Sequence, residues 1–463
     1  MAILLSDTLY SGLPLQSQGR LEKSFDSVGL WEEWAAQGPS VFLESAGALG
    51  EASEWLIVAG LPDKEYFESE GKDWLADDSG LHPAGFNFWD FTDSIGSGHD
   101  RFSLLPYSLS ASWFGVCSYE FGFCFQPGVK KTLGGLPKLV RDFYFFKPSR
   151  LLAVNRRSKE YFLFGRGDFD PFKDAFRPRQ PFKVQAIQAE WSLGDYQSKV
   201  QRVQDYIQAG DIYQANLAQS FQARWEGNPG SLYRVLREMN PGPFMGIFRG
   251  RDFTVVSSSP ERLVSGEGSR LETRPIAGTR PRGKDETEDL QMKVELQTNP
   301  KEQAEHLMLV DLARNDLGRV ARYGTVEIRR YADVESYARV HHLVSTVQAQ
   351  RLEFATLSDI LKSLFPGGTI TGCPKLRCME IIHELEERPR GFYTGSMGYL
   401  APGPCFDFNI LIRSFTLFSN GVLEFHAGAG IVADSDSQRE YMETLYKVEA
   451  LAQALGSSLV TPT

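Results

Sequence analysis

The sequence has few cysteines, no long apolar run and no excess of positive charge. Its 463 residues include only five cysteines, and no two of them are spaced as CxxC. An odd number at wide spacing predicts free thiols in a reducing compartment. The first letters, MAILLSDTLYSG, lack the basic start and the long apolar core of a signal peptide, and no other stretch is long and apolar enough to cross a bilayer. We therefore expect a cytoplasmic protein that does not act at a membrane.

The net charge of the chain argues against nucleic acid as a partner. The formal net charge is -10. Nucleic-acid binding requires clustered Lys and Arg to neutralise phosphates, so nucleic acid is not an expected partner. The length is sufficient for two or three domains, or for one large two-layer unit with an ample core.

The first part of the chain is β-rich and irregular. Short strands are predicted at 41–43 and 55–58, a hairpin at 151–164, and a strand that is buried on both faces at 143–146. Prolines mark a seam at 176–181, where we place a boundary between two regions.

The second part of the chain alternates helices and strands. The spacing predicts a helix over 196–207 that ends at Gly210, then a strand over 211–219 from which Gln214 can enter a pocket. Strands are also expected at 253–256, 408–418 and 422–426, the last two joined by an Asn-Gly turn. The final helix should end at Gly456.

The stretch KEQAEHLMLVDLARNDLGR, residues 301–319, has two interpretations. Leu307, Met308, Leu309, Leu312 and Ala313 recur at helical spacing, which predicts a buried helix. Glu302 and Glu305 share one face, and two acids on one face suit a hard cation such as Mg²⁺. The alternative is a solvated acidic face on which Lys301 and Glu305 form an ordinary i, i+4 pair.

Acidic residues of the final helix have the same two interpretations. Glu440 and Glu443 lie on the side opposite the apolar stripe, together with Lys447. The structural alternative is that Ser437 and Glu440 form a capping box and that Glu443 and Lys447 form an i, i+4 pair.

Four further segments hold candidate residues. Glu261 follows a strand and a run of small residues, a position that suits either a pocket or a turn. The segment 274–283 is basic and contains glycine, and by itself it indicates a flexible surface loop. His341 and His342 are adjacent, so one of them should point inward, where a core histidine with satisfied hydrogen bonds is the usual outcome. The glycines of 365–375 precede a helix and form a natural seat for an anion.

The order and spacing of these motifs together resemble the chorismate-utilising enzymes, over about residues 196–455. This group contains anthranilate synthase component I, aminodeoxychorismate synthase component I, isochorismate synthases and salicylate synthases. The matching stretches are GDIYQANLAQ, SSSPERL, RPIAGTRPRG, AEHLMLVDLARNDLGRV, HHLVSTV, FPGGTITGCPKLRCMEIIHELE, FYTGSMGYL, DFNILIRS and AGAGIVADSDSQREYMETLYK.

The resemblance implies an α/β (α+β) fold in which two antiparallel sheets pack as a sandwich with helices outside. It also implies a catalytic domain over 190–456, preceded by an accessory region over 1–180. Mg²⁺ would be the cofactor, because oxygen ligands from a few carboxylates suit that ion. The positions that match metal ligands are Glu305, Glu440 and Glu443, with Glu302 close by.

The resemblance also assigns roles around the substrate. Glu261 matches the general acid that protonates the departing C4 hydroxyl of chorismate, and His342 matches a histidine near the ring. Gln214 occupies a position where members that add water carry a lysine, so ammonia is the expected nucleophile and isochorismate and salicylate synthesis are disfavoured. The positions that match substrate-binding residues are Gly278, Thr279, Tyr393, Arg413, Gly428, Ala429, Gly430 and Lys447.

Two ammonia-using activities remain open. Asn216 and the phrases NLAQ, VHHLVSTV and PGGTITG resemble aminodeoxychorismate synthase, which supplies 4-aminobenzoate for folate, and this is the activity that we predict. Ala277 instead resembles anthranilate synthase, because many aminodeoxychorismate synthases have a lysine there. Glu44 and Ser45 resemble part of a tryptophan-binding motif, although its usual downstream residues are replaced by Gly50-Glu51-Ala52. A non-catalytic tryptophan-binding homologue is a third hypothesis, disfavoured because the matching acids are all present.

The chain lacks the GxCxGxQ motif of glutamine amidotransferases, since Cys117 lies in the different sequence GVCSY. We therefore expect a separate glutamine amidotransferase subunit to supply the ammonia.

Overall fold

The computed structural model describes residues 12–22, 25–45, 54–96, 105–125, 140–167, 169–172, 180–403 and 405–462. Residues 1–11 of the N-terminal stretch discussed above lie outside these ranges, as do residues 46–53 and most of the predicted seam at 176–181. No helix in the described ranges is both long enough and apolar enough to cross a membrane.

The strands pair in an antiparallel order and form two layers that are joined through shared long strands. In the described chain every pairing is antiparallel apart from the short one between β10 and β24. One layer consists of β11 (Gln214–Gly227), β23 (Val422–Ile431), β22 (Ser414–Phe418), β13 (Phe253–Ser259), β12 (Phe244–Arg249) and β2 (Ser40–Glu44).

The second layer is reached through two long strands, β3 (Trp55–Ser69) and β7 (Phe143–Asn155). One end of β3 pairs with β2 of the first layer, and one end of β7 pairs with β6 of the second. This layer consists of β6 (Trp113–Cys117), β20 (Ser396–Ala401), β21 (Cys405–Asn409), β14 (Arg262–Glu267), β15 (Arg270–Arg274), β18 (Val340–Gln350), β16 (Ile276–Pro281) and β17 (Glu327–Ser336).

Short strands extend the edges of both layers. They are β1 (Leu15–Arg20), β4 (Lys72–Asp77), β5 (Gly80–Pro83), β8 (Glu160–Gly165), β9 (Phe182–Val184), β10 (Ile187–Ala189), β19 (Gly372–Cys373) and β24 (Leu459–Val460).

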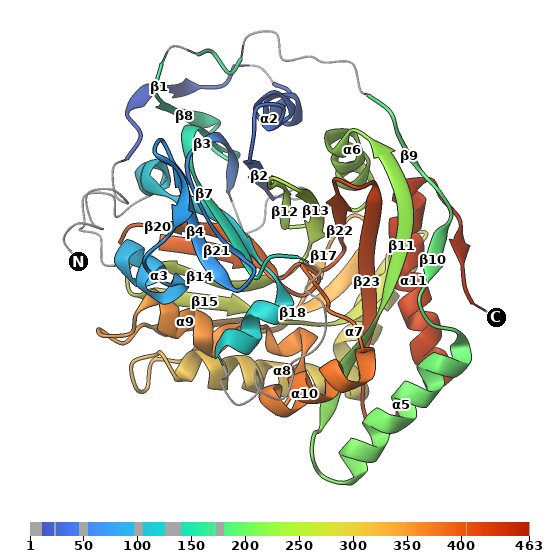
Figure 1. The fold of residues 1–463 in the computed structure, drawn as a ribbon. Helices are drawn as coiled ribbons and strands as arrows, with labels where there is room; N and C mark the ends of the chain where they lie inside the picture. The colour runs from blue at the N-terminus through green and yellow to red at the C-terminus, as the bar shows by residue number, and fades with distance from the viewer. Residues whose placement is uncertain are drawn as a thin grey trace.

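An apolar core lies between the two layers. Phe248 and Val255 of the first layer pack in one buried cluster with Phe114, Met397 and Tyr399 of the second. Figure 1 shows the strands in the middle of the molecule, with helices outside them. The predicted mixed α/β architecture is therefore confirmed.

Helices cover the outer faces in two groups. On the first layer lie α2 (Ser27–Ala35), α6 (Pro229–Met239) and α11 (Ser437–Leu455). A second cluster includes residues of α3 (Phe88–Gly96), α5 (Leu193–Gln208), α8 (Pro300–Gly318), α9 (Leu357–Leu364) and α10 (Lys375–Glu386). Helix α7 (Glu286–Thr298) contacts β16, and short 3₁₀ turns occur at η2 (Tyr107–Ala111), η3 (Tyr119–Phe125) and η4 (Gly368–Ile370).

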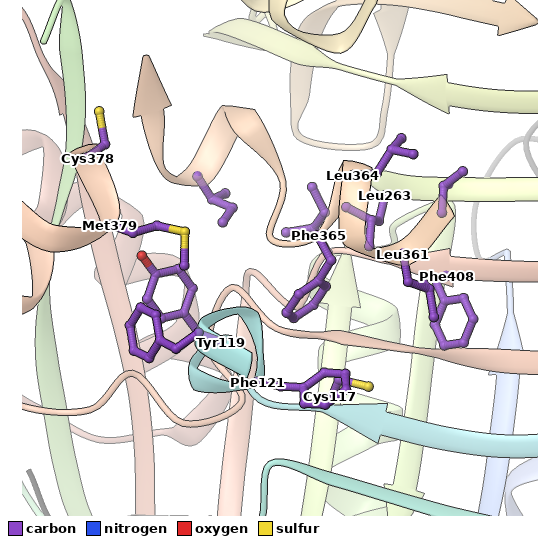
Figure 2. Packing of buried hydrophobic residues seen from close by; sticks show 14 of the residues in the cluster. Cys117, Tyr119, Phe121, Leu263, Leu361, Leu364, Phe365, Cys378, Met379 and Phe408 are labelled. Atoms are coloured by element: carbon purple, nitrogen blue, oxygen red, sulfur yellow. The ribbon is translucent and has the colours of Figure 1, made fainter. Parts of the chain in front are cut away.

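The N-terminal and C-terminal parts of the chain share this core. Besides the pairs β2–β12 and β6–β20, Tyr119 and Phe121 of η3 pack in the same cluster as Met379 of α10 and Phe365 (Figure 2). The predicted division into regions 1–180 and 190–456 stays a prediction.

Several predicted elements differ from the observed ones. The strand predicted over 408–418 is two strands, because the chain turns at Arg413, which has a φ of 52°. The segment 274–283 is not a loop, since residues 276–281 form β16 against β18. Helix α8 exists as predicted and Leu309 is buried, but Leu307 is 49% exposed. The other buried residues of the helix include His306, Val310 and Leu317, which were not in the predicted stripe.

Candidate functional site

The candidate site begins where β11 meets α8. Gln214, the first residue of β11, is buried, and its amide nitrogen donates to Glu305 Oε1 at 3.2 Å. A Cβ atom at Gly430 of β23 would lie 2.3 Å from that amide nitrogen and 3.5 Å from the Glu305 carboxylate. A side chain at 430 would therefore displace the end of the Gln214 side chain. That Gln214 enters a pocket stays a prediction.

Helix α11 adds two more carboxylates and a lysine. Glu440 is buried and accepts a hydrogen bond from the Ser435 hydroxyl at 2.8 Å. The capping box of Ser437 with Glu440 is wrong, since the N-cap of α11 is Asp436, whose carboxylate accepts the Arg439 N–H at 2.8 Å. The predicted pair of Glu443 with Lys447 is confirmed at 2.8 Å.

Burial and neighbouring carboxylates raise the pKa values of Glu305 and Glu440. Burial is the main cause that raises the pKa of Glu305, and the carboxylates of Glu302 and Glu443 add to it, whereas the Gln214 hydrogen bond and Lys447 oppose it. The pKa of Glu440 is also raised, by burial and by Glu443, against Ser435 and two lysines. Negative charge is therefore in excess here, which is the condition that a divalent cation relieves.

The acids do not form a complete metal cage. Among the described residues, no group of three or more His, Cys, Asp or Glu side chains could hold a metal ion by itself. Mg²⁺ is usually bound through one or two carboxylates, with water and substrate completing the shell, so the donor set fits that ion without a cage.

Glu302 lies beside the acids but has a partner of its own. Its carboxylate is 2.9 Å from Arg280 of β16. A Cβ atom at Gly278 would lie 2.6 Å from the same carboxylate, and Gly278 has a φ of 65°, so glycine is required there on both counts.

A bulge at Gly278 determines which residue of β18 lies opposite Thr279. The register of β16 against β18 shifts between Ala277 and Thr279, and Thr279 then pairs with His342. The Thr279 hydroxyl lies 3.0 Å from His342 Nδ1.

His342 is held neutral between two groups. Burial and the charge of Arg413 lower the pKa of His342 to about 3. Arg413 Nη2 lies 3.1 Å from His342 Nε2 and can only donate, so Nε2 accepts and the ring proton is on Nδ1, near Thr279 and the Gly278 carbonyl. Its neighbour His341 is also buried but lies between Ser336 and Asp289, as a core histidine with both nitrogens bonded.

Glu261 lies just beyond the end of β13 and is buried. Burial raises the pKa of Glu261 to about 7, and the nearby Thr369 hydroxyl, the Ile276 N–H and the charge of Arg413 oppose that rise without cancelling it. Arg413 is half-buried, and its removal from water lowers its pKa to about 10, while Tyr337 and Glu261 raise it. A carboxyl group that is protonated near neutral pH suits a general acid.

The glycine-containing end of β23 borders the acids. Residues 428–430 pair with 216–218 of β11 on one edge, and β22 pairs only with Leu423 and Glu424. The Lys447 ammonium donates to the Gly428 carbonyl at 2.9 Å, which connects this strand to α11. Ala429 is buried between the two glycines.

Tyr393 is buried beside β23. Its ring stacks on His426 of β23 with centroids 5.0 Å apart, and burial raises its pKa to about 12. His426 precedes Gly428 by two residues, so Tyr393 lies next to the same strand.

Two buried polar atoms of this region have no hydrogen-bond partner in the described chain. They are Gln214 Oε1 and Asn216 Oδ1. Buried polar groups are normally paired, so two such atoms on one strand indicate a place prepared for a ligand or for water.

The residues of the predicted tryptophan site lie elsewhere. Glu44 of β2 is buried and bonded to Tyr233 and Arg237, at 2.8 and 2.7 Å, and Ser45 is buried beside it. Glu44 borders a cavity of about 510 Å³ between the layers, which is also lined by Trp55, Met245, Arg262, Tyr399 and Asp407. The sequence motif singled out Glu44 as part of a possible tryptophan site, but it did not predict this cavity.

Two contributors were missed by sequence reasoning. Arg280 pairs with Glu302, and its only signal was its place in a basic segment that we interpreted as a loop. Arg390 is 2% exposed and was singled out by no motif.

Comparisons with known proteins identify the family of the chain. A family model described as chorismate binding enzyme matches residues 69–453. The chain is 51% identical over 363 residues to an anthranilate synthase component I-like protein of Synechocystis, which covers 76% of this chain and 73% of that protein. It is 43% identical over 359 residues to aminodeoxychorismate synthase component 1 of Escherichia coli, covering 76% and 78% of the two chains.

Solved structures agree as well. The anthranilate synthase component I of Streptococcus pneumoniae superposes with a TM-score of 0.72 at 29% identity, covering 87% of this chain and 93% of that one. The chain therefore belongs to the chorismate binding enzyme family, as a chorismate-utilising enzyme of the anthranilate synthase and aminodeoxychorismate synthase type.

Proposed function

We propose that this protein aminates chorismate with ammonia to form 4-amino-4-deoxychorismate, the precursor of 4-aminobenzoate. The observation that carries the chemistry is Glu261, a buried carboxyl group whose pKa is raised to about 7 beside Arg413 and Thr369. A C4 hydroxyl leaves readily only when it is protonated. Glu261 donates that proton as the C4–O bond breaks, water leaves, and ammonia supplies the new C–N bond.

His342 and Arg413 orient the substrate rather than exchange protons with it. Because the pKa of His342 is lowered to about 3, its imidazole is neutral at physiological pH and fixes the Arg413 guanidinium through Nε2. The planar guanidinium then binds a carboxylate of the enolpyruvyl group, with Tyr393 on the same side. Gly278, Thr279 and the backbone of Gly428, Ala429 and Gly430 complete the substrate pocket, with Lys447 beside the ring carboxylate.

Glu305, Glu440 and Glu443, with Glu302 nearby, are the residues that would hold Mg²⁺. Bound there, the ion would carry the ring carboxylate of chorismate and withdraw electrons from the ring. The excess of negative charge among these acids, described above, supports the assignment.

The ammonia comes from a separate glutamine amidotransferase subunit in this proposal. The relatives are named component I or component 1, and the chain has no GxCxGxQ motif of its own. Free ammonium should replace that subunit in vitro.

Anthranilate formation is the second candidate, and Ala277 favours it. Many aminodeoxychorismate synthases carry a lysine at this position, and the chain is also 48% identical over 269 residues, 58% of each protein, to anthranilate synthase component 1 of Thermus thermophilus. In that reaction ammonia adds at C2, and pyruvate is eliminated after the C4 hydroxyl has left.

The test is to incubate the purified protein with chorismate, Mg²⁺ and ammonium, and to follow products by mass spectrometry and fluorescence. An aminated product that retains the enolpyruvyl group, and that an added lyase converts to 4-aminobenzoate, supports the first proposal. Fluorescent anthranilate with equimolar pyruvate supports the second. Mg²⁺ binding without any turnover at saturating ammonium would contradict both and indicate the non-catalytic homologue.

A further inference from the structure

Strand β11 carries Gln214 and Asn216, and only one of its edges is paired with a long strand. On that edge β23 pairs with residues 215–224. On the other edge β19 reaches only Gln214 and Ala215, and β10 begins to pair only at Phe221. The backbone groups between these two short strands need other partners, because unpaired buried groups are costly.

A side-chain ion pair supplies two of those partners, while the N–H of Asn216 donates to the Thr371 carbonyl at 2.9 Å. The carbonyl of Asn216 accepts from Arg390 Nη2 at 2.7 Å, and the N–H of Ala218 donates to Glu386 Oε1 at 2.9 Å. Arg390 and Glu386 bond each other at 2.6 and 2.8 Å. The pair therefore takes the place of a neighbouring strand next to residues 216–218, which lie directly opposite Gly428–Gly430.

All five N–H donors of Arg390 are used. Besides Asn216 and both oxygens of Glu386, the guanidinium donates to the Ile370 carbonyl at 2.9 Å and to the Thr394 hydroxyl at 3.3 Å. Ile370 follows Thr369 in sequence, and Thr394 follows Tyr393. One planar group thus fixes three segments of the site at once, which three donors on a flexible lysine stem cannot reproduce.

The N-terminal part of the chain binds the backbone of Arg390 and packs against its guanidinium. Glu120 of η3 accepts the backbone N–H groups of Arg390 and Gly391, at 2.7 and 3.1 Å. The guanidinium lies 4.7 Å from the centre of the Tyr119 ring, which Figure 2 shows beside Met379.

We propose that Arg390, together with Glu386, is a positioning residue for the chorismate site, holding β11, the Thr369 segment and Tyr393 in their relative places. The inference rests on the proposed function for its kinetic consequences, but its structural part does not. Arg390 does not itself contact the reacting atoms.

The experiment compares Arg390→Lys with wild type and with a matched control. The control is Arg234→Lys, because Arg234 also joins segments through ion pairs, with Asp26 and Glu32, but lies between α2 and α6. We expect Arg390→Lys to lower kcat/KM for chorismate by about tenfold or more, through a higher KM for chorismate and a lower kcat with the KM for ammonium unchanged, since small displacements of binding groups are costly. Arg234→Lys should lower Tm only.

Hydrogen–deuterium exchange of the unliganded protein supplies a readout that is independent of turnover. Peptides covering 214–219 and 393–395 should exchange faster in Arg390→Lys and not in Arg234→Lys. If wild type turns over no chorismate, the proposed function fails and the exchange result alone decides the positioning role.

Wild-type kcat/KM and wild-type exchange in Arg390→Lys would overturn the inference, as would a loss of Tm alone like that of the control. If Arg390→Lys does not fold, Glu386→Gln decides. It keeps the size of the side chain but removes the charge, so the same kinetic and exchange pattern is expected, and wild-type behaviour would overturn the inference.

Discussion

Glu261 and Arg262 are adjacent in sequence but belong to two different buried regions. Arg262 is bonded to Asp407 at 2.8 and 2.9 Å and to Glu272 at 2.6 Å, so its charge is fully compensated. Within the described part of the chain, Glu261 has no charged partner of comparable geometry, and burial raises its pKa to about 7. Removing one partner of a buried ion pair is strongly destabilising, because an uncompensated charge is left behind. Buried groups that remain incompletely paired cost stability in the native protein and are retained where a ligand completes them.

Removing the Glu261 carboxyl group should have the largest effect on activity of the changes that test this comparison. Glu261→Gln should lower kcat/KM by about 10²- to 10⁴-fold, because the amide cannot donate a proton to the leaving hydroxyl. Steady-state kinetics measures the loss, and calorimetry should find chorismate binding largely intact. Unchanged rates would remove Glu261 from the acid role.

A substitution among Arg262 and its carboxylate partners should lower stability rather than activity. Asp407→Asn leaves Arg262 buried with one charged partner, so the free energy of unfolding should fall by about 3 kcal/mol. Denaturant unfolding followed by circular dichroism measures this. The folded variant should retain its kcat/KM at low temperature, and a loss of activity without a loss of stability would show that the two regions are not separate.

The pH dependence follows from the direction of the Glu261 shift. Its carboxyl group is protonated below a pKa of about 7, so kcat/KM for chorismate at saturating free ammonia should fall about tenfold per pH unit above that value. His342, with its pKa lowered to about 3, should add no second limb near neutrality.

Glu120 offers a control for the pH profile, because burial raises its pKa to about 7 as well. The limb should persist in Glu120→Gln if Glu261 is the titrating group. Its disappearance in that variant would assign the limb to Glu120.

The smallest effect concerns the acids of α11. Glu440→Gln retains the Ser435 hydrogen bond but removes repulsion from Glu443, so without metal the protein should gain about 0.5 kcal/mol in unfolding free energy. The stabilisation produced by added Mg²⁺ should fall at the same time. Thermal unfolding with and without Mg²⁺ measures both, and an unchanged Mg²⁺ effect would exclude Glu440 as a ligand.

The sequence predicted elements that local chemistry determines. Gly456 ends α11 with a φ of 62°, and Asn420-Gly421 joins β22 to β23, because these turns need residues that tolerate such backbone angles. Long apolar strands such as 143–146 were equally clear.

Elements that tertiary contacts decide were not predictable. β16 appears as a strand only because β18 pairs with it, and the break at Arg413 brings its side chain to His342 across sequence-distant segments. In the candidate site, the acids and His342 were found through family motifs. Arg390 carried no local signal, since its five partners come from four separate segments.

The pairing of β2 with β12 and of β6 with β20 has a consequence for how the chain reaches its native state. Both layers contain strands from the first and the last thirds of the sequence, so most of their stabilising contacts join distant residues. Chains with such high contact order fold slowly, because closing a long loop costs entropy before the stabilising contacts have formed. Neither sheet can be completed during synthesis until the final third has left the ribosome, and until then the long strands β3 and β7 lack part of their cover.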